Sequence, residues 1–144
     1  HIPGIGLSNC DSHFKTPIIK ASKKELNKKD FKPFRDNKSF FAMTGHAIYP
    51  TYDPYNTATH SKIIIQHVIR KKMNFKGILI SDDISMEALK FTLKENATKA
   101  LEAGCNLALH CNGDIDEMSE LVKVIPLIDK FTKKKTSDFY KFLR

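Results

Sequence analysis

Ser81-Asp82-Asp83 follows directly on the apolar run Ile78-Leu79-Ile80, and its two aspartates are the first candidates for chemistry in this sequence. Adjacent carboxylates at the end of a buried strand are costly to desolvate unless a reaction uses them or a partner neutralises them. An aspartate in this place can also cap a following helix. We expect Asp83 to act as such a cap, whereas residue chemistry alone leaves a functional and a structural role for Asp82 equally open.

Two further polar clusters contain histidine. In the first, Asp11 stands two residues before His13. A carboxylate so placed can bond the imidazole, fix its tautomer and raise its basicity, which suits a general acid/base near neutral pH. Many such triplets are ordinary surface loops. The second cluster is His46 after Thr44-Gly45, and a lone histidine of this kind is more often a hydrogen-bonded structural residue.

The elements that must position these groups are short strands alternating with helices. Residues 1–20 are rich in Gly, Pro, Ser and Asn and predict a loop. Apolar runs predict buried strands starting near Phe40, Phe75 and Cys105, with a turn-rich loop through Pro50 and Pro54. Helical patterns cover residues 22–33, 61–73, about 86–103, 116–124 and 130–143, with Ser22 and Ser61 as N-terminal caps and Gly104 as a C-terminal cap.

This alternation predicts an α/β fold with a parallel sheet, whose reactive groups gather where the strands end. A closed (β/α)8 barrel needs roughly 250 residues, and the chain has 144. The fold is therefore either a small open sheet or the second half of a barrel.

Composition limits the possible partners. The 24 Lys and Arg residues against 16 Asp and Glu give a net charge of +8, which favours anionic partners. The basic residues are spread in pairs and triplets at helix ends, a pattern typical of solvated faces, so we expect no nucleic-acid partner. Three cysteines without a C-x-x-C pair indicate neither a disulfide framework nor a zinc module and fit a reducing compartment. No apolar run approaches the roughly 20 residues of a membrane span.

Several motifs occur in the order and spacing of one known family. The run His1-Ile-Pro-Gly-Ile5-Gly, followed four residues later by Asp11-Ser12-His13, resembles the K-H-F/I-P-G-H-G-x₄-D-S-H loop of the β-N-acetylglucosaminidases of glycoside hydrolase family 3. The segment from Phe75 to Met86 resembles their G-F-x-G-V-I-x-S-D-D-L-S-M strand. Residues 31–35, 43–46 and 103–106 resemble their D-L-x-P-F-R, M-T-A-H and A-G-C-D segments. The likeness covers nearly all of residues 1 to about 112.

This resemblance implies a fold and a set of site residues. The fold would be the C-terminal half of a (β/α)8 barrel, with residues 1–144 as part of the catalytic domain, residues 1–20 as its catalytic loop and the N-terminal half outside the chain. Asp82 would be the nucleophile, His13 the acid/base and Asp11 the residue that orients it. The residues that match substrate-binding positions are His1, His46 and Met86.

The function implied is that of a retaining exo-β-N-acetylglucosaminidase that needs no metal or organic cofactor. It would release N-acetylglucosamine from muropeptides in the cytoplasm, without a membrane partner, and the chain alone is not expected to be active. A family 3 β-glucosidase, an N-acetylglucosaminide phosphorylase and an inactive α/β binding module are the alternatives. Ile5 and Asn106 depart from the family motifs, which have histidine and aspartate there.

Overall fold

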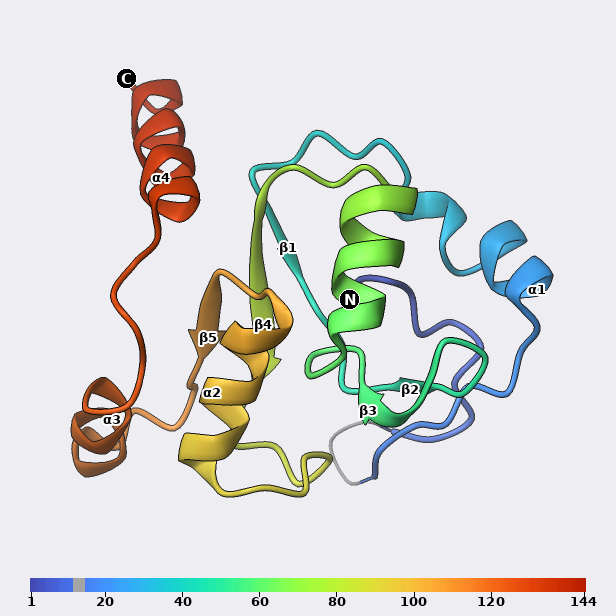
Figure 1. Cartoon of the computed structure of the whole chain (residues 1–144), viewed down its shortest axis with the longest axis horizontal. Helices are drawn as coiled ribbons and strands as arrows, with labels where there is room; N and C mark the ends of the chain where they lie inside the picture. The colour runs from blue at the N-terminus through green and yellow to red at the C-terminus, as the bar shows by residue number, and fades with distance from the viewer. Residues whose placement is uncertain (12–14) are drawn as a thin grey trace.

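A computed structural model describes residues 1–11 and 15–144, and its centre is a three-stranded parallel sheet (Figure 1). The strands lie in the order β1 (Phe41–Met43), β4 (Ile78–Asp83) and β5 (Leu107–Leu109). In the register, Phe41 lies opposite Ile78, and Ile80 lies opposite Leu107. All three strands expected from the apolar runs are present, and the predicted parallel sheet is confirmed.

Helices and a small hairpin surround this sheet. They are α1 (Lys23–Lys28), η1 (Lys32–Phe34), β2 (Ile48–Tyr49), β3 (Asp53–Thr57), η2 (Ile64–Lys72), α2 (Leu93–Ala103), α3 (Ile115–Val122) and α4 (Lys130–Phe142). The predicted caps form: the Ser22 hydroxyl accepts a bond from the Glu25 amide, and Gly104 ends α2 in the left-handed conformation at φ 119°. A side chain is disfavoured at that φ, which explains the glycine.

Helix η2 supplies much of the core. Its buried stripe, Ile64, Ile65, Val68 and Ile69, packs in one cluster with Leu79 of the central strand. Ser61 accepts a bond from the Ile64 amide at 3.1 Å, as its expected capping role requires. The turns are wider than those of the predicted α-helix, because η2 is a π-helix, and at its end the Met73 amide donates to the carbonyl of Val68, five residues back.

Two predictions about the connections are wrong. Residues expected to form a turn-rich loop build the antiparallel β2–β3 pair instead. The Asp53 carboxylate makes this possible, since it accepts bonds from the Tyr55 and Asn56 amides and from the Ser61 hydroxyl. The helix expected from about residue 86 begins only at Leu93, because Thr92 and Glu95 form a reciprocal capping box there.

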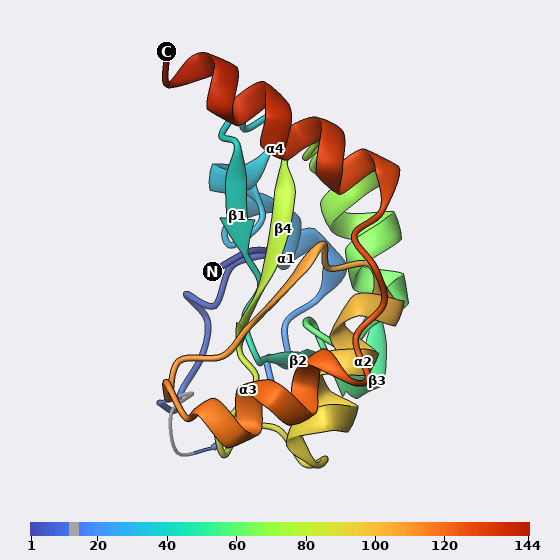
Figure 2. The ribbon, with the colours of Figure 1, turned by 90° about the vertical axis from the view of Figure 1, so that its left-hand side faces the viewer.

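Helices η2 and α4 lie on opposite sides of the sheet, and α4 runs across the end where β1 and β4 begin (Figures 1 and 2). Aromatic contacts hold α4 there: the ring of Phe139 lies 5.3 Å from that of Phe40 and 4.9 Å from that of Phe41. The opposite end of the sheet, where the strands finish, is therefore free of α4 and carries the polar residues described next.

Candidate active site

Asp82 lies near the carboxyl end of β4, with 9% of its surface exposed. Its backbone amide donates to the Thr44 hydroxyl at 3.3 Å, which ties the end of β4 to the end of β1. One carboxylate oxygen, Oδ1, accepts a bond from the Asp83 amide at 3.0 Å. The other, Oδ2, lies 3.2 Å from Nε2 of His1. The carboxylate is thus held at a strand end by two donors.

The contact between His1 and Asp82 sets the charge of both groups. Burial would raise the pKa of the Asp82 carboxyl, but the bonds from His1 and from the Asp83 amide, with the charge of His1, bring this pKa below its ordinary value. The bond to Asp82 raises the pKa of the His1 imidazole above its ordinary value, against the effect of burial. Asp82 is therefore a carboxylate at neutral pH, and its charge favours the protonated form of His1.

The backbone next to His1 is tightly anchored, although 40% of the His1 side chain is exposed. Ile2 is buried and forms a parallel bridge to Thr44, in which its amide donates to the Met43 carbonyl at 2.7 Å. Two residues further on, the Gly4 carbonyl accepts a bond from the Tyr49 hydroxyl at 2.6 Å. These contacts place the loop beside the end of β1 and direct the His1 ring to Asp82.

Gly45 makes room for this loop. A Cβ atom at position 45 would lie 3.2 Å from Cβ of His1 and 3.2 Å from Cγ2 of Ile5. The family motifs described above have alanine at position 45 and histidine at position 5. Gly45 and Ile5, the two residues that differ from the family motifs, lie next to each other, so the glycine makes room for the branched Ile5 side chain.

His46 is 1% exposed, and protein groups occupy both of its ring nitrogens. Nδ1 lies 2.8 Å from the Thr59 hydroxyl, and Nε2 lies 2.8 Å from the Asp83 carbonyl oxygen. Burial lowers the pKa of His46, so the ring is neutral. This geometry favours a positioning role over the substrate contact expected from the sequence.

Asp83 does not cap a helix, and that prediction is wrong. Its carboxylate accepts bonds from the Ser85 amide and hydroxyl and from the Cys111 amide, so it stabilises a turn and connects that turn to the segment after β5. No helix begins there: residues 84–88 form turns and a bend, and the next helix begins only at Leu93. Met86 lies in the same turns and is half-buried, four residues beyond Asp82.

The acid/base candidate His13 lies outside the described residues. Asp11, which would orient it, is exposed in the first loop, where its carbonyl accepts a bond from the Lys15 amide at 3.2 Å. The structure thus brings together Asp82, His1 and His46. Sequence reasoning missed the contributions of Thr44 and Thr59, two threonines that are both fully buried between these groups.

Comparisons with known proteins identify the family of the chain. The family model of the glycosyl hydrolase family 3 N-terminal domain matches residues 1–135. The chain belongs to glycosyl hydrolase family 3. The β-hexosaminidase of Nitrosomonas eutropha is 38% identical over 127 residues, covering 85% of this chain and 36% of the relative. The β-hexosaminidase of Haemophilus influenzae is 38% identical over 118 residues, covering 78% of this chain and 33% of the relative.

Solved family 3 structures have the same fold. NagZ from Neisseria gonorrhoeae, in complex with N-trifluoroacetyl-D-glucosamine, superposes with a TM-score of 0.81 at 33% identity over 94% of this chain and 40% of that chain. A family 3 β-N-acetylglucosaminidase from Paenibacillus gives a TM-score of 0.80 at 28% identity, over 86% of this chain and 24% of that chain. These matches confirm the expected fold class, part of a (β/α)8 barrel. The chain spans about a third of the length of the curated relatives it matches.

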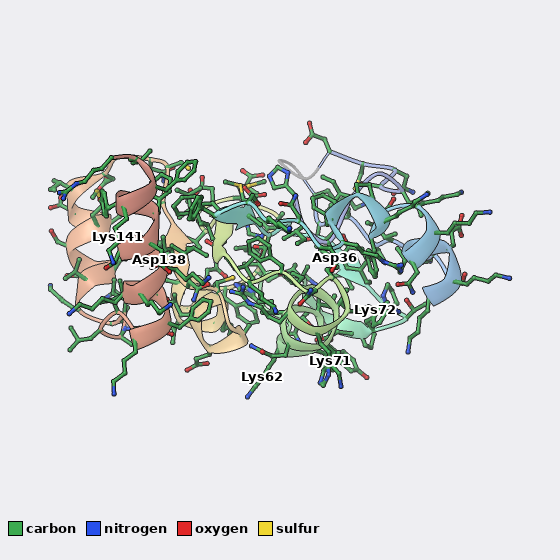
Figure 3. The ribbon with its side chains drawn as sticks, turned by 90° about the horizontal axis from the view of Figure 1, so that it is seen from above. Asp36, Lys62, Lys71, Lys72, Asp138 and Lys141 are labelled. Carbon is green, nitrogen blue, oxygen red and sulfur yellow. The ribbon has the colours of Figure 1, made fainter. Side chains whose placement is uncertain are left out.

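Two surface features bear on the choice of partner. Lys141 lies on α4, whereas Lys71 and Lys72 lie on η2 and Lys62 lies just before it, on the other side of the molecule. These lysines therefore do not form one stripe (Figure 3). Such a stripe would be the mark of a nucleic-acid surface. Among residues 1–11 and 15–144, no helix has the length and apolar character needed to cross a membrane.

Proposed function

We propose that the full-length protein is a retaining exo-β-N-acetylglucosaminidase. The observation that carries this proposal is the ionised Asp82 carboxylate, held at the carboxyl end of a parallel strand with Oδ2 3.2 Å from His1 Nε2. In (β/α)8 enzymes catalytic groups lie at this end of the strands. The relatives named β-hexosaminidase, and the NagZ complex with an N-acylated glucosamine, support a sugar of this type.

In the proposed reaction, the Asp82 carboxylate attacks the anomeric carbon and displaces the oxygen of the leaving group. His13, oriented by Asp11, gives that oxygen its proton. In the second step His13 takes a proton from water, the water oxygen attacks the same carbon, and the bond to Asp82 breaks. Two inversions give net retention of the β configuration. His1 beside Asp82 would contact the sugar, and Met86 would line the same side of the site.

The biological setting is a further part of the proposal. The substrate would be a muropeptide with a terminal N-acetylglucosamine, as the family resemblance implies. Free cysteines at positions 10, 105 and 111 are consistent with a reducing compartment, in keeping with a cytoplasmic enzyme. The rest of the barrel would come from chain outside residues 1–144, because the relatives are about three times as long. Residues 1–20 would form the catalytic loop of the assembled domain.

Product stereochemistry tests this function. The full-length protein is incubated with 4-nitrophenyl β-N-acetylglucosaminide, and the anomeric protons are followed by NMR from the first minutes. We expect the β anomer of N-acetylglucosamine to appear first, followed by slow mutarotation. An α product formed first would contradict a nucleophilic role for Asp82.

Parallel reactions separate the alternatives. A sugar 1-phosphate formed when phosphate is added would identify a phosphorylase, and faster release from the β-glucoside would identify a β-glucosidase. No turnover of any substrate would favour a non-catalytic binding module.

A further inference from the structure

Behind Asp82, buried side chains form a hydrogen-bonded chain that the reaction described above does not use. Thr44, Thr59 and His46 are at most 1% exposed. The Thr44 and Thr59 hydroxyl oxygens lie 2.9 Å apart, and the Thr59 oxygen lies 2.8 Å from Nδ1 of His46. We call these three side chains the Thr44–Thr59–His46 relay. It begins at the Asp82 amide and ends at the Asp83 carbonyl.

The direction of every bond in the relay follows from its last one. The Asp83 carbonyl oxygen can only accept, so Nε2 of His46 carries the hydrogen. Nδ1 of the neutral ring then has none and must accept the hydrogen of the Thr59 hydroxyl. Thr59 Oγ1 in turn accepts from Thr44, whose own oxygen accepts from the Asp82 amide. The longer 3.3 Å contact from Thr59 to the Gly45 carbonyl competes for the same hydrogen but would leave Nδ1 unpaired.

We propose that Thr59 is a positioning residue, which holds the backbone of Asp82 and Asp83 through this relay, at the Asp82 amide and the Asp83 carbonyl, and so fixes the place of the nucleophile. The inference rests on the proposed function. The relay bonds the nitrogen of Asp82 at one end and the oxygen of Asp83 at the other, so it holds the backbone from which the carboxylate extends. The Thr59 hydroxyl lies between the other two members and bonds both the Thr44 hydroxyl and the His46 ring, so it is the central link.

The chain offers a matched control for this link. Thr57 lies two residues away and is also buried, at 7% exposure, but its hydroxyl has no hydrogen-bond partner among the described residues. Thr57→Val and Thr59→Val therefore make the same chemical change in the same segment, and only the second breaks the relay. Thr59→Ser keeps the hydroxyl and loses a methyl group.

Steady-state kinetics of the full-length protein on 4-nitrophenyl β-N-acetylglucosaminide test the role. We expect Thr59→Val to lower kcat about 10- to 100-fold, because small misplacements of reacting groups have effects of this size, while KM stays within about twofold. Thr59→Ser and Thr57→Val should stay within about threefold of the wild-type kcat. A wild-type kcat in Thr59→Val, or a Thr59→Ser variant as slow as Thr59→Val, would overturn the proposal.

A second measurement does not depend on activity. The ¹⁵N shifts of His46 in the full-length protein report which ring nitrogen carries hydrogen. The relay requires hydrogen on Nε2 alone, and a ring with hydrogen on Nδ1 would overturn it even if Thr59→Val failed to fold. If the wild-type protein hydrolyses no glycoside, the proposed function fails, and this measurement still decides whether the relay exists.

Discussion

At the carboxyl ends of the strands, Thr44, Thr59 and His46 are at most 1% exposed, whereas at the amino ends helix α4 leaves Phe142 71% exposed and Leu143 62% exposed. The first region is held by short polar side chains whose bonds run from strand to strand. The second is held by aromatic contacts with the sheet. A site that must keep a carboxylate in place needs the first kind of support, because buried, fully bonded networks are rigid.

One polar bond also attaches α4 to the sheet, and it depends on a departure from the family motif. Asn106 Oδ1 accepts bonds from Arg70 and from the Leu79 amide, and its Nδ2 donates to the Thr132 hydroxyl at 2.8 Å. The aspartate of the family motif has no such donor and could not make the last bond in this form. Asn106 thus links β4, η2 and α4.

The largest effect on stability that we predict is at the amino end of the sheet. Gly77 stands at the amino end of β4, where a Cβ atom would lie 2.6 Å from the carbonyl oxygens of both Ser39 and Phe40. Because these are backbone atoms of the neighbouring segment, we expect Gly77→Ala to lower the free energy of unfolding by about 3 kcal/mol. Urea unfolding of the full-length protein measures this change.

Gly113→Ala is the control for this substitution. Gly113 has φ 71° and no atom within 4 Å of an added Cβ. The Gly113→Ala substitution should lower the free energy of unfolding by about 1 kcal/mol, from backbone strain alone. Equal losses in the two variants would show that the close approach of the Ser39 and Phe40 carbonyl oxygens to Gly77 adds nothing to the cost.

A smaller and local effect is predicted at α4. Thr132→Val removes the acceptor for Asn106 Nδ2, and the free energy of unfolding should fall by about 1 kcal/mol. Hydrogen exchange should become about fivefold faster in α4, with little change for the Asp82 amide. The matched control is Thr136→Val, because within the described part of the chain the Thr136 hydroxyl bonds only carbonyl oxygens of its own helix, those of Thr132 and Lys133. Faster exchange throughout the sheet would contradict the separation of the two regions.

The sequence predicted the elements whose signals are local. Apolar runs marked the strands at Phe41, Ile78 and Leu107, and cap residues such as Ser22 marked helix ends. The β2–β3 hairpin was missed because its stability comes from Asp53, whose carboxylate accepts bonds from two backbone amides, those of Tyr55 and Asn56. A segment rich in turn-forming residues gives no sequence pattern that would predict such a strand.

The candidate site was predictable in part for a similar reason. Asp82 and His1 were identified through motifs that run along the chain. Thr59 follows the hairpin in a stretch without periodicity, and its partners stand 13 and 15 residues earlier in the sequence. Only the three-dimensional arrangement brings its hydroxyl to His46, so no sequence pattern indicated it.

The most direct test of the account compares two identical substitutions at opposite ends of the sheet. Asp82→Asn removes the proposed nucleophile, whereas Asp36→Asn removes one carboxylate at the amino ends of the strands, where Asp36 lines a cavity with Phe40 and Gly77 (Figure 3). In the full-length protein we expect Asp82→Asn to reduce hydrolysis of the chromogenic N-acetylglucosaminide at least about 1,000-fold. Asp36→Asn should retain it. Equal activity in the two variants would contradict the assignment of Asp82 as the nucleophile.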